Sequence, residues 1–295
     1  MTLLVFDIGG TSVKYALFKD GELGEVSYFQ TPKTWDALKV QIKSLKETYE
    51  TEGIVGLAFS CLGVVDAKKG MIGGVSAVPY LHHFPIVREL EDLCQLPVAI
   101  ENDANCAALA ELSFGVARDV ADSAFFIIGS GVGGALILDR SLRKGVDLFT
   151  GEFGLMSMMN GETLSQLVSP VHLAKRYQKE MKTPAITGED IFRLAKTGDK
   201  LAGDLVSSFY ETLSRAIVNV ALVVNPELIV IGGAISKRDD LLTYLNQSIE
   251  QLKVGLHIED LTCRLATCRY YNDANLLGAA SNWLTQFGTM SKRDL

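Results

Sequence analysis

Apolar and polar positions follow each other in short blocks that predict a mixed α/β chain. Five apolar runs have the length of buried strands, and each ends at a polar or glycine-rich segment. The runs lie at residues 3–7, 54–59, 97–100, 124–128 and 228–231. The stretch 34–49 differs, because Leu38, Ile42, Leu45 and Tyr49 recur at helical spacing. This pattern predicts a helix that covers the first strands.

The remaining pattern extends the alternation of strands and helices. Further helices are predicted at 87–94, 104–114 and 274–287, and the chain from 164 to 252 is mainly helical apart from the strand 228–231. At the N-terminus, strands at 12–18 and 24–29 follow the first strand, and the turn Lys19-Asp20-Gly21 joins them as a hairpin.

The first strand runs directly into Gly9, Gly10 and Thr11. Glycines adopt backbone conformations closed to other residues, and without a Cβ they leave room for a phosphate near main-chain N–H groups. Asp7 before the turn is a candidate ligand for Mg²⁺, directly or through water, and Lys14 after it is a mobile cation. By itself this turn also fits a plain hairpin.

A similar strand, glycine turn and strand recur about a hundred residues later. The strand 124–128 leads into Gly129-Ser130-Gly131-Val132-Gly133-Gly134 and returns at 135–138. Two such halves facing each other would place two phosphate-contacting turns against one nucleotide. We therefore expect two domains: residues 1–115 with the C-terminal helix 274–295, and residues 116–273.

Two more glycine turns offer ligand contacts. Gly232 and Gly233 end the strand 228–231 before a helix predicted from Arg238 onward, so an adenosine could lie flat on the backbone there; a plain strand-to-helix turn is the alternative. Glu152 stands between Gly151 and Gly154, where it is either a ligand-binding carboxylate or a solvated loop residue.

A polar cluster follows the strand 97–100. Glu101, Asn102 and Asp103 precede a helix, and Asp103 could serve only as its N-cap. The carboxyl end of a strand is also where α/β proteins build their sites. A carboxylate there can accept the proton of a sugar hydroxyl, and Asn102 has both a donor and an acceptor for a polyol.

Composition narrows the classes of function. Of 295 residues, 48% are hydrophobic and 21% charged, as in a globular protein. The net charge of −7, without a Lys/Arg-rich run, argues against a nucleic-acid or anionic-membrane surface. Neither a leader peptide nor a spanning segment is recognisable, so we expect a cytoplasmic protein. Its five cysteines are expected to be reduced and buried, and its four histidines form no zinc pattern.

Together these motifs resemble the ROK sugar kinases of the actin/hexokinase/Hsp70 ATPase superfamily, over nearly the whole chain. Residues 6–11 resemble the first phosphate motif, 129–134 the second and 231–233 the adenosine motif. Residues 101–105 are similar to the segment with the catalytic Asp, and 151–154 to a sugar-binding loop. The resemblance implies a two-domain actin-like ATPase fold with an active-site cleft between the domains.

Two departures from the family pattern concern the sugar. Leu155 occupies the position where the usual member has a histidine that touches the sugar and ligates a structural zinc, and residues 156–161 replace the cysteine-rich loop. We therefore expect no zinc, and apolar space for an aglycone or a second sugar. Residues 151–154 and 187–192 look like the β-glucoside kinase branch.

The resemblance implies direct transfer of the ATP γ-phosphoryl group, with Mg²⁺, to the 6-hydroxyl of a β-glucoside or a disaccharide such as cellobiose. Asp103 would be the catalytic base, and the candidate sugar-binding residues are Gly63, Asn102, Glu152 and Leu155. The nucleotide would contact Asp7, Gly9, Gly10, Thr11, Lys14, Gly129, Ser130, Gly131, Gly133, Gly232 and Gly233. A homodimer is a family expectation. The alternatives are an N-acetylmannosamine kinase, a glucokinase, or a non-catalytic sugar sensor.

Overall fold

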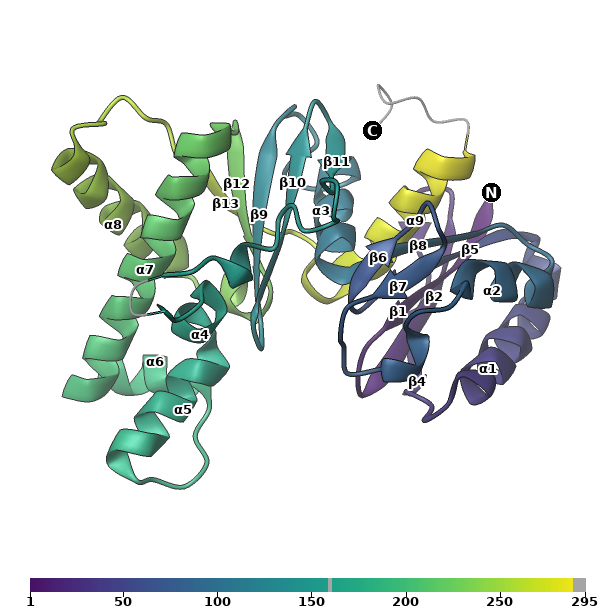
Figure 1. Ribbon diagram of the computed structural model, residues 1–295, viewed down its shortest axis with the longest axis horizontal. Helices are drawn as coiled ribbons and strands as arrows, with labels where there is room; N and C mark the ends of the chain where they lie inside the picture. The colour runs from purple at the N-terminus through teal and green to yellow at the C-terminus, as the bar shows by residue number, and fades with distance from the viewer. Residues whose placement is uncertain (159–160, 289–295) are drawn as a thin grey trace. The chain divides into compact units, whose positions relative to one another are not determined.

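The computed structural model describes residues 1–158 and 161–288, which form two compact units (Figure 1). Unit 1 comprises Met1–Arg118, Gly145–Phe149 and the chain from Asn272; unit 2 comprises Asp119–Lys144 and Thr150–Tyr271. From the sequence, residues 145–149 were expected in the second domain, whereas the contacts of this segment place it in unit 1. The C-terminal end of the predicted helix 274–295, from 289, and part of the loop 156–161 lie outside the described residues.

Unit 1 contains a sheet with the order β3-β2-β1-β5-β8, in which β4 also pairs with β2. Its strands are β1 (Thr2–Ile8), β2 (Ser12–Lys19), β3 (Glu22–Leu23), β4 (Ser27–Gln30), β5 (Ile54–Cys61) and β8 (Val98–Asn102). The predicted strand 24–29 begins later, as β4 from Ser27, and β3 lies before it; β3 and β4 pair with opposite ends of β2. The glycine-rich stretch after residue 63 contains a hairpin that the pattern did not predict, β6 (Val64–Asp66) with β7 (Met71–Gly73).

Helices cover both faces of this sheet. Figure 1 shows α1 (Trp35–Thr48) and α2 (Ile86–Cys94) on one side and α9 (Ala274–Phe287) on the other. Side chains alternate along β1, so Leu4 and Phe6 pack with Leu38 and Ile42 of α1. Thr34 caps α1 by accepting from the Ala37 N–H, which confirms the start of this predicted helix.

Small residues let α9 approach both α3 (Asp103–Ser113) and the sheet closely. A Cβ on Gly278 would collide with the backbone carbonyl of Cys106 in α3. The Trp283 ring lies directly over Gly56 of β5, and its Nε1–H donates to the Pro97 carbonyl oxygen at 3.1 Å. These contacts tie the C-terminal helix to the centre of unit 1.

Unit 2 contains a sheet with the order β11-β10-β9-β12-β13 and five α-helices among its described residues. The strands are β9 (Ser123–Ile128), β10 (Val132–Leu138), β11 (Ser141–Arg143), β12 (Leu228–Gly232) and β13 (Leu265–Thr267), the last of which was not predicted. The helices are α4 (Leu164–Val168), α5 (Pro170–Met181), α6 (Gly188–Lys196), α7 (Lys200–Val224) and α8 (Leu241–Leu256). Residues of α7 and α8 pack on β9 and β12 in one buried cluster.

The repeat expected from the sequence is present in both units. In unit 1, β1 pairs antiparallel with β2 and parallel with β5. In unit 2, β9 pairs antiparallel with β10 and parallel with β12. Each unit therefore presents a glycine turn at the carboxyl end of its first strand.

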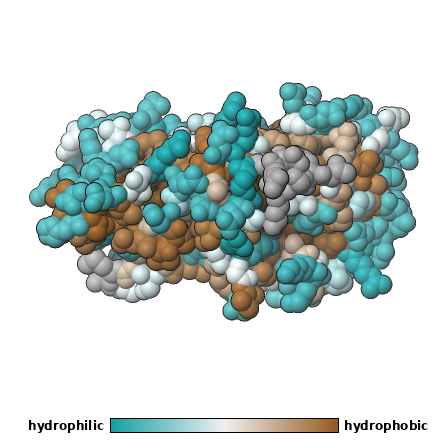
Figure 2. Space-filling view, turned by 90° about the horizontal axis from the view of Figure 1, so that it is seen from above, coloured by the Kyte–Doolittle hydropathy of each residue, from teal (hydrophilic) through white to brown (hydrophobic). Residues whose placement is uncertain are grey.

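The surface mixes polar and apolar side chains. Figure 2 shows hydrophilic residues interspersed with hydrophobic patches over the face that it presents. Several large apolar side chains are exposed, among them Leu155 and Val223. Among the residues that the structure describes, no helix combines the length and the apolar composition needed to cross a bilayer.

The close crossing of α3 and α9 generates a stability prediction. Gly278→Ala would push α9 away from the Cys106 carbonyl, and we expect a loss of about 1–3 kcal/mol in the free energy of unfolding. Urea denaturation followed by circular dichroism and by the fluorescence of Trp35 and Trp283, both in unit 1, measures it.

Gly255→Ala in α8 is the matched control, because a Cβ there meets nothing within 4 Å. This change should be neutral or stabilise the helix by up to about 1 kcal/mol. Equal stability of the Gly278→Ala variant and the unmodified chain would contradict the close crossing.

Candidate active site

The carboxyl ends of three parallel strands gather the polar residues of unit 1 at one sheet edge. Asp7 of β1 pairs in register with Ser60 of β5, which pairs with Glu101 of β8. Asn102 and Asp103 follow immediately, at the start of α3. The fold therefore brings Asp7, the predicted Mg²⁺ ligand, and Asp103, the predicted catalytic base, to the same edge of the sheet.

Asp7 is held by three neighbours. Its Oδ1 accepts from Ser60 Oγ at 2.9 Å and from Asn275 Nδ2 at 3.1 Å, while Lys14 Nζ lies 4.0 Å from Oδ2. Burial raises the pKa of Asp7, and these two hydrogen bonds and the Lys14 charge act against that rise. Lys14 also donates to the Asn272 carbonyl oxygen at 3.2 Å, so it is tied to this site.

The first glycine turn needs glycine for a different reason from the one expected. Neither Gly9 nor Gly10 has a positive φ. Instead, a Cβ on Gly9 would lie 2.9 Å from the Ser12 carbonyl oxygen, and one on Gly10 would lie 2.8 Å from the Ala77 Cβ. Thr31 Oγ1 donates to the Gly9 carbonyl oxygen at 2.6 Å, which holds the turn while Gly10 and Thr11 remain exposed.

Asn102, and not Asp103, is the N-cap of α3. The Asn102 Oδ1 accepts from the backbone N–H of Ala104 and Asn105, and its Nδ2 donates to the Gly63 carbonyl oxygen at 3.0 Å. Asp103 is the first residue of the helix and is half-buried. The capping alternative for Asp103 was therefore wrong, and Asn102 has a structural task in addition to its predicted contact with the sugar.

Two buried side chains, Glu101 and Cys61, lie beside this polar cluster. Glu101 is 2% exposed, and its Oε1 accepts from the Asn102 N–H and from Asn105 Nδ2. Cys61 is fully buried, and burial together with the charges of Asp7, Asp103 and Glu101 raises the pKa of its thiol. Cys61 is thus a buried thiol, as the sequence predicted, within the field of three carboxyl groups, whereas Cys263 is only partly buried.

Gly63 lies at a turn that requires glycine. Its φ is +99°, and a Cβ would lie 2.9 Å from the ring of His82. The His82 ring nitrogens are themselves within hydrogen-bond distance of Ser76 Oγ and the Gly73 carbonyl oxygen. These contacts of His82 hold the loop whose Gly63 carbonyl oxygen accepts from Asn102 Nδ2.

The second glycine turn, in unit 2, has open space in front of it. A Cβ on Gly129 would meet nothing within 4 Å, and one on Gly131 would make only ordinary contact with Ser165. Ser169, fully buried, donates to the Ser130 carbonyl oxygen at 2.7 Å, and the Val132 N–H donates to Ser165 Oγ. The turn is shorter than predicted, because β10 begins at Val132 and contains both Gly133 and Gly134.

The third glycine turn lies at the same edge of the unit 2 sheet. Gly232 pairs with Ile127, and Gly233, at φ +81°, rests against the backbone of Ile128. A 3₁₀ turn, Ala234–Lys237, follows, and α8 begins only at Leu241 instead of at Arg238. Beside this turn is a cavity of about 330 Å³, lined by Pro170, Gly188, Glu189, Phe192, Ala234, Ile235, Lys237 and Arg238.

The loop around Glu152 is fixed by its glycines. Gly151 has a φ of +91°, and a Cβ on Gly154 would collide with the Val132 backbone. Glu152 is half-buried, and burial raises the pKa of its carboxyl group. Leu155, which follows this loop, is 59% exposed. Among the described residues, no group of three or more His, Cys, Asp or Glu side chains is arranged to hold a metal ion.

Sequence reasoning missed the residues that hold these parts in place. They are Thr31, Ser60, Ser165, Ser169 and Asn275. Each is a short polar side chain that reaches a site residue far along the chain, and Asn275 is 268 positions from Asp7. No local pattern distinguishes such residues from surface polar ones.

Comparisons with known proteins agree with this arrangement. The ROK family model matches residues 3–286. A β-glucoside kinase of Klebsiella pneumoniae is 31% identical over 95% of this chain and 95% of its own length. An N-acetylmannosamine kinase of Salmonella heidelberg is 31% identical, with 95% of this chain and 97% of that protein covered.

A solved structure is similar in fold. The crystal structure of a ROK family protein from Streptococcus pneumoniae in complex with sucrose is 30% identical, with 97% of this chain and 99% of that chain covered and a TM-score of 0.89. Motifs, topology and these similarities agree: the chain belongs to the ROK family and has its two-domain actin-like ATPase fold.

Proposed function

We propose that this protein is an ATP-dependent sugar kinase that phosphorylates the 6-hydroxyl of a β-glucoside or a disaccharide such as cellobiose. The observation that carries the proposal is the placement of Asp103 at the N-terminus of α3, on the sheet edge that also bears Asp7. The named β-glucoside kinase of Klebsiella pneumoniae supports the choice of substrate.

Asp103 is the proposed catalytic base. It would orient the 6-hydroxyl of the sugar and accept its proton as the oxygen attacks the γ-phosphorus. The N-cap of α3 is Asn102, and Asp103 Oδ1 is a further acceptor, 2.9 Å from the Ala104 nitrogen.

The glycine turns are proposed to bind the phosphates through backbone N–H groups. Gly10 and Thr11 are exposed at the first turn, and the space beside Gly129 and Gly131 admits a ligand at the second. Asp7 fits a Mg²⁺ ligand: its Oδ1 accepts from Ser60 and Asn275, while the described residues give Oδ2 only the 4.0 Å approach of Lys14. When bound, Mg²⁺ neutralises charge on the phosphates.

The adenosine is proposed to occupy the cavity beside Gly233 and Ala234. Its volume of about 330 Å³ is within the range of small-molecule pockets. Phe192 provides an apolar wall, and Glu189 and Lys237 offer an acceptor and a donor to a base or ribose. Gly232 and Gly233 would allow the close approach to the backbone that the sequence motif predicts.

The sugar is proposed to contact Glu152, Gly63 and Asn102. Three of the four hydrogen-bonding positions of the Asn102 amide are engaged, two by backbone N–H groups of α3 and one by the Gly63 carbonyl oxygen, and its second Nδ2–H is proposed to donate to a hydroxyl. Leu155 is exposed and apolar, so an aglycone or second sugar ring would pack on it where a histidine would require a hydrogen bond.

The leading alternative is an N-acetylmannosamine kinase, because the Salmonella heidelberg relative is equally similar. A glucokinase is a second alternative within the same class, and a sugar sensor without turnover is a third. A homodimer and a cytoplasmic location complete the proposal.

Replacement of the base separates chemistry from binding. We expect Asp103→Asn to lower kcat by about a hundredfold or more, while the sugar Kd stays near that of the unmodified chain, because the amide cannot accept the proton. A coupled ADP-release assay and calorimetric sugar titration measure the two quantities. Asp92→Asn, on the exposed face of α2, is the control and should keep full turnover. Near-normal kcat in Asp103→Asn would exclude Asp103 as the base.

A sugar panel tests the substrate. We expect a higher kcat/KM for cellobiose and methyl β-glucoside than for glucose or N-acetylmannosamine. Leu155→His should reduce that preference, since the change replaces the proposed apolar contact with the aglycone by an imidazole that requires a hydrogen-bond partner. Leu256→His, at a position 55% exposed in α8, is the matched control. An unchanged preference in Leu155→His would contradict the aglycone contact, and a highest kcat/KM for N-acetylmannosamine would select the alternative kinase.

The pH dependence of activity tests the role of Asp7. The hydrogen bond from Ser60 lowers the pKa of Asp7 against the effect of burial, so Ser60→Ala should raise that pKa further. The carboxylate is then protonated at a higher pH, and the acid limb of the kcat/KM profile should move upward. Ser113→Ala, which removes a bond to Ser281, should leave the limb in place. If the acid limb of the kcat/KM profile lies at the same pH in Ser60→Ala and in the unmodified chain, ionisation of Asp7 does not control activity.

A further inference from the structure

The two carboxylate oxygens of Asp7 have different surroundings. Ser60 Oγ and Asn275 Nδ2 both donate to Oδ1, and because a carboxylate oxygen has two lone pairs, these donors engage both of them. Oδ2 accepts no hydrogen bond from the described residues, and Lys14 Nζ, at 4.0 Å, is beyond hydrogen-bond distance. The Asp7 side chain is 13% exposed. One oxygen is therefore held by the protein, and the other can meet a ligand.

Asn275 reaches Asp7 from a firmly packed helix. It is the second residue of α9, its neighbour Leu276 is fully buried, and Gly278 in the next turn lies against the Cys106 carbonyl oxygen. Among the described residues, the bond to Asp7 is the only hydrogen bond of the Asn275 side chain. The amide therefore contributes to the orientation of Asp7 and to no other hydrogen bond in the part of the chain that the structure describes.

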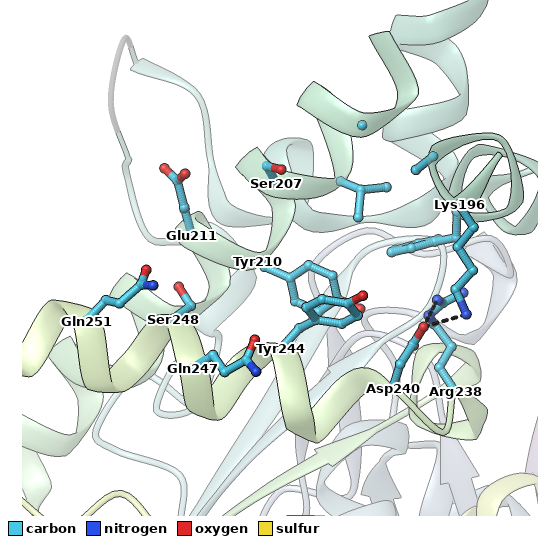
Figure 3. Close-up of a pocket in the computed structure, with 14 residues that line it drawn as sticks. Lys196, Ser207, Tyr210, Glu211, Arg238, Asp240, Tyr244, Gln247, Ser248 and Gln251 are labelled. Carbon is cyan, nitrogen blue, oxygen red and sulfur yellow. Dashed lines mark hydrogen bonds and ion pairs between the residues drawn. The ribbon is translucent and has the colours of Figure 1, made fainter. Parts of the chain in front are cut away.

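A carboxylate in unit 2 provides a contrast. Figure 3 shows Asp240 beside Lys196 and Arg238, and its Oδ2 accepts from their nitrogens at 2.7 and 2.8 Å. Two protein cations at these distances balance the charge of Asp240, so a further cation would gain little there. The two hydrogen-bond donors of Asp7 are neutral, and Lys14 stands 4.0 Å away. Asp7 thus has a fixed orientation and still offers negative charge to a metal ion.

The engagement of Oδ1 restricts how a metal ion can bind Asp7. Ca²⁺ has flexible coordination and accepts a carboxylate through one oxygen or through both. Mg²⁺ demands near-ideal octahedral geometry, which the narrow angle between the two oxygens of one carboxylate does not fit. With both lone pairs of Oδ1 engaged, Asp7 offers one oxygen, Oδ2. This arrangement suits Mg²⁺ and withholds the two-oxygen mode from Ca²⁺.

We propose that Asn275, together with Ser60, is a positioning residue that makes the metal site at Asp7 selective for Mg²⁺ over Ca²⁺. The inference rests on the proposed function, in which Asp7 is a ligand of the metal that accompanies ATP. Asn275 acts through Asp7, because its bond keeps Oδ1 engaged. Loss of either donor frees a lone pair of Oδ1, so the carboxylate can rotate and chelate Ca²⁺ through both oxygens, while Mg²⁺ loses a ligand of fixed orientation.

The test measures metal selectivity in the full chain with ADP and without sugar, so that no turnover contributes. Mn²⁺ is the probe, and its displacement by Mg²⁺ or by Ca²⁺ is followed through the relaxation of water protons. The same ADP concentration in every sample makes the contribution of free nucleotide common to all variants. Asn275→Leu removes the donor and keeps a side chain branched at Cγ. We expect the ratio of the Ca²⁺ Kd to the Mg²⁺ Kd to fall about tenfold, the low end of what the loss of a hydrogen-bond partner of a metal ligand costs in metal affinity.

A second variant and a matched control accompany this measurement. Ser60→Ala removes the other donor, from β5, and should lower the same ratio even if Asn275→Leu does not fold. Asn282→Leu makes the same change elsewhere on α9, where the amide donates to the Ile100 carbonyl oxygen at 3.2 Å and not to Asp7. The selectivity of this control should equal that of the unmodified chain.

An unchanged ratio in folded Asn275→Leu or Ser60→Ala, as when Asp7 reaches the metal only through water, would overturn the inference, and so would an equal loss in Asn282→Leu. Failure of the unmodified chain with ADP to bind Mn²⁺ would remove the metal site together with the inference. Sugar-dependent ADP release tests the proposed function separately. Release with Mg²⁺ but unchanged selectivity in the variants rejects only the role of Asn275, whereas a selectivity shift without release on any sugar supports that role and rejects the proposed kinase reaction.

Discussion

Parallel pairing of β1, β5 and β8 is the constraint on which the site of unit 1 depends. It sets Asp7, Ser60 and Glu101 in one row, with Asn102 and Asp103 just beyond. A slip of one residue would exchange the faces of every side chain on a strand, so the apolar core that α1 packs against also fixes the register of the polar row. The chemistry of this edge and the stability of the core are therefore set by the same hydrogen-bond ladder.

Glycine acts in this molecule mainly through the space it leaves. Gly278 lets α9 reach the backbone of α3, and Gly10 lets the first turn lie against Ala77. At Gly129 a Cβ would meet no atom of the described residues within 4 Å. The same residue type thus serves close packing inside unit 1 and leaves open space at a turn in unit 2, and sequence alone does not separate the two uses.

Most strands and helices were predictable, because their patterns are local. The helix after Thr34 and the strand-turn-strand repeat were confirmed, whereas the β6–β7 hairpin and β13 were missed, since they are short and their pairing partners give no local signal. The N-cap position of α3 is Asn102 and not Asp103, and both side chains accept from the free Ala104 N–H, while only Asn102 also reaches that of Asn105.

The sequence by itself determined the candidate reactive groups, the repeated glycine turns and the ROK family, because these are properties of residue type and spacing. Tertiary structure alone decided that Ser60 and Asn275 hold Asp7, and that Lys196 pairs with Asp240. Those contacts join helices and strands distant along the chain. Which polar groups are satisfied depends on how these elements pack, and no local pattern carries that information.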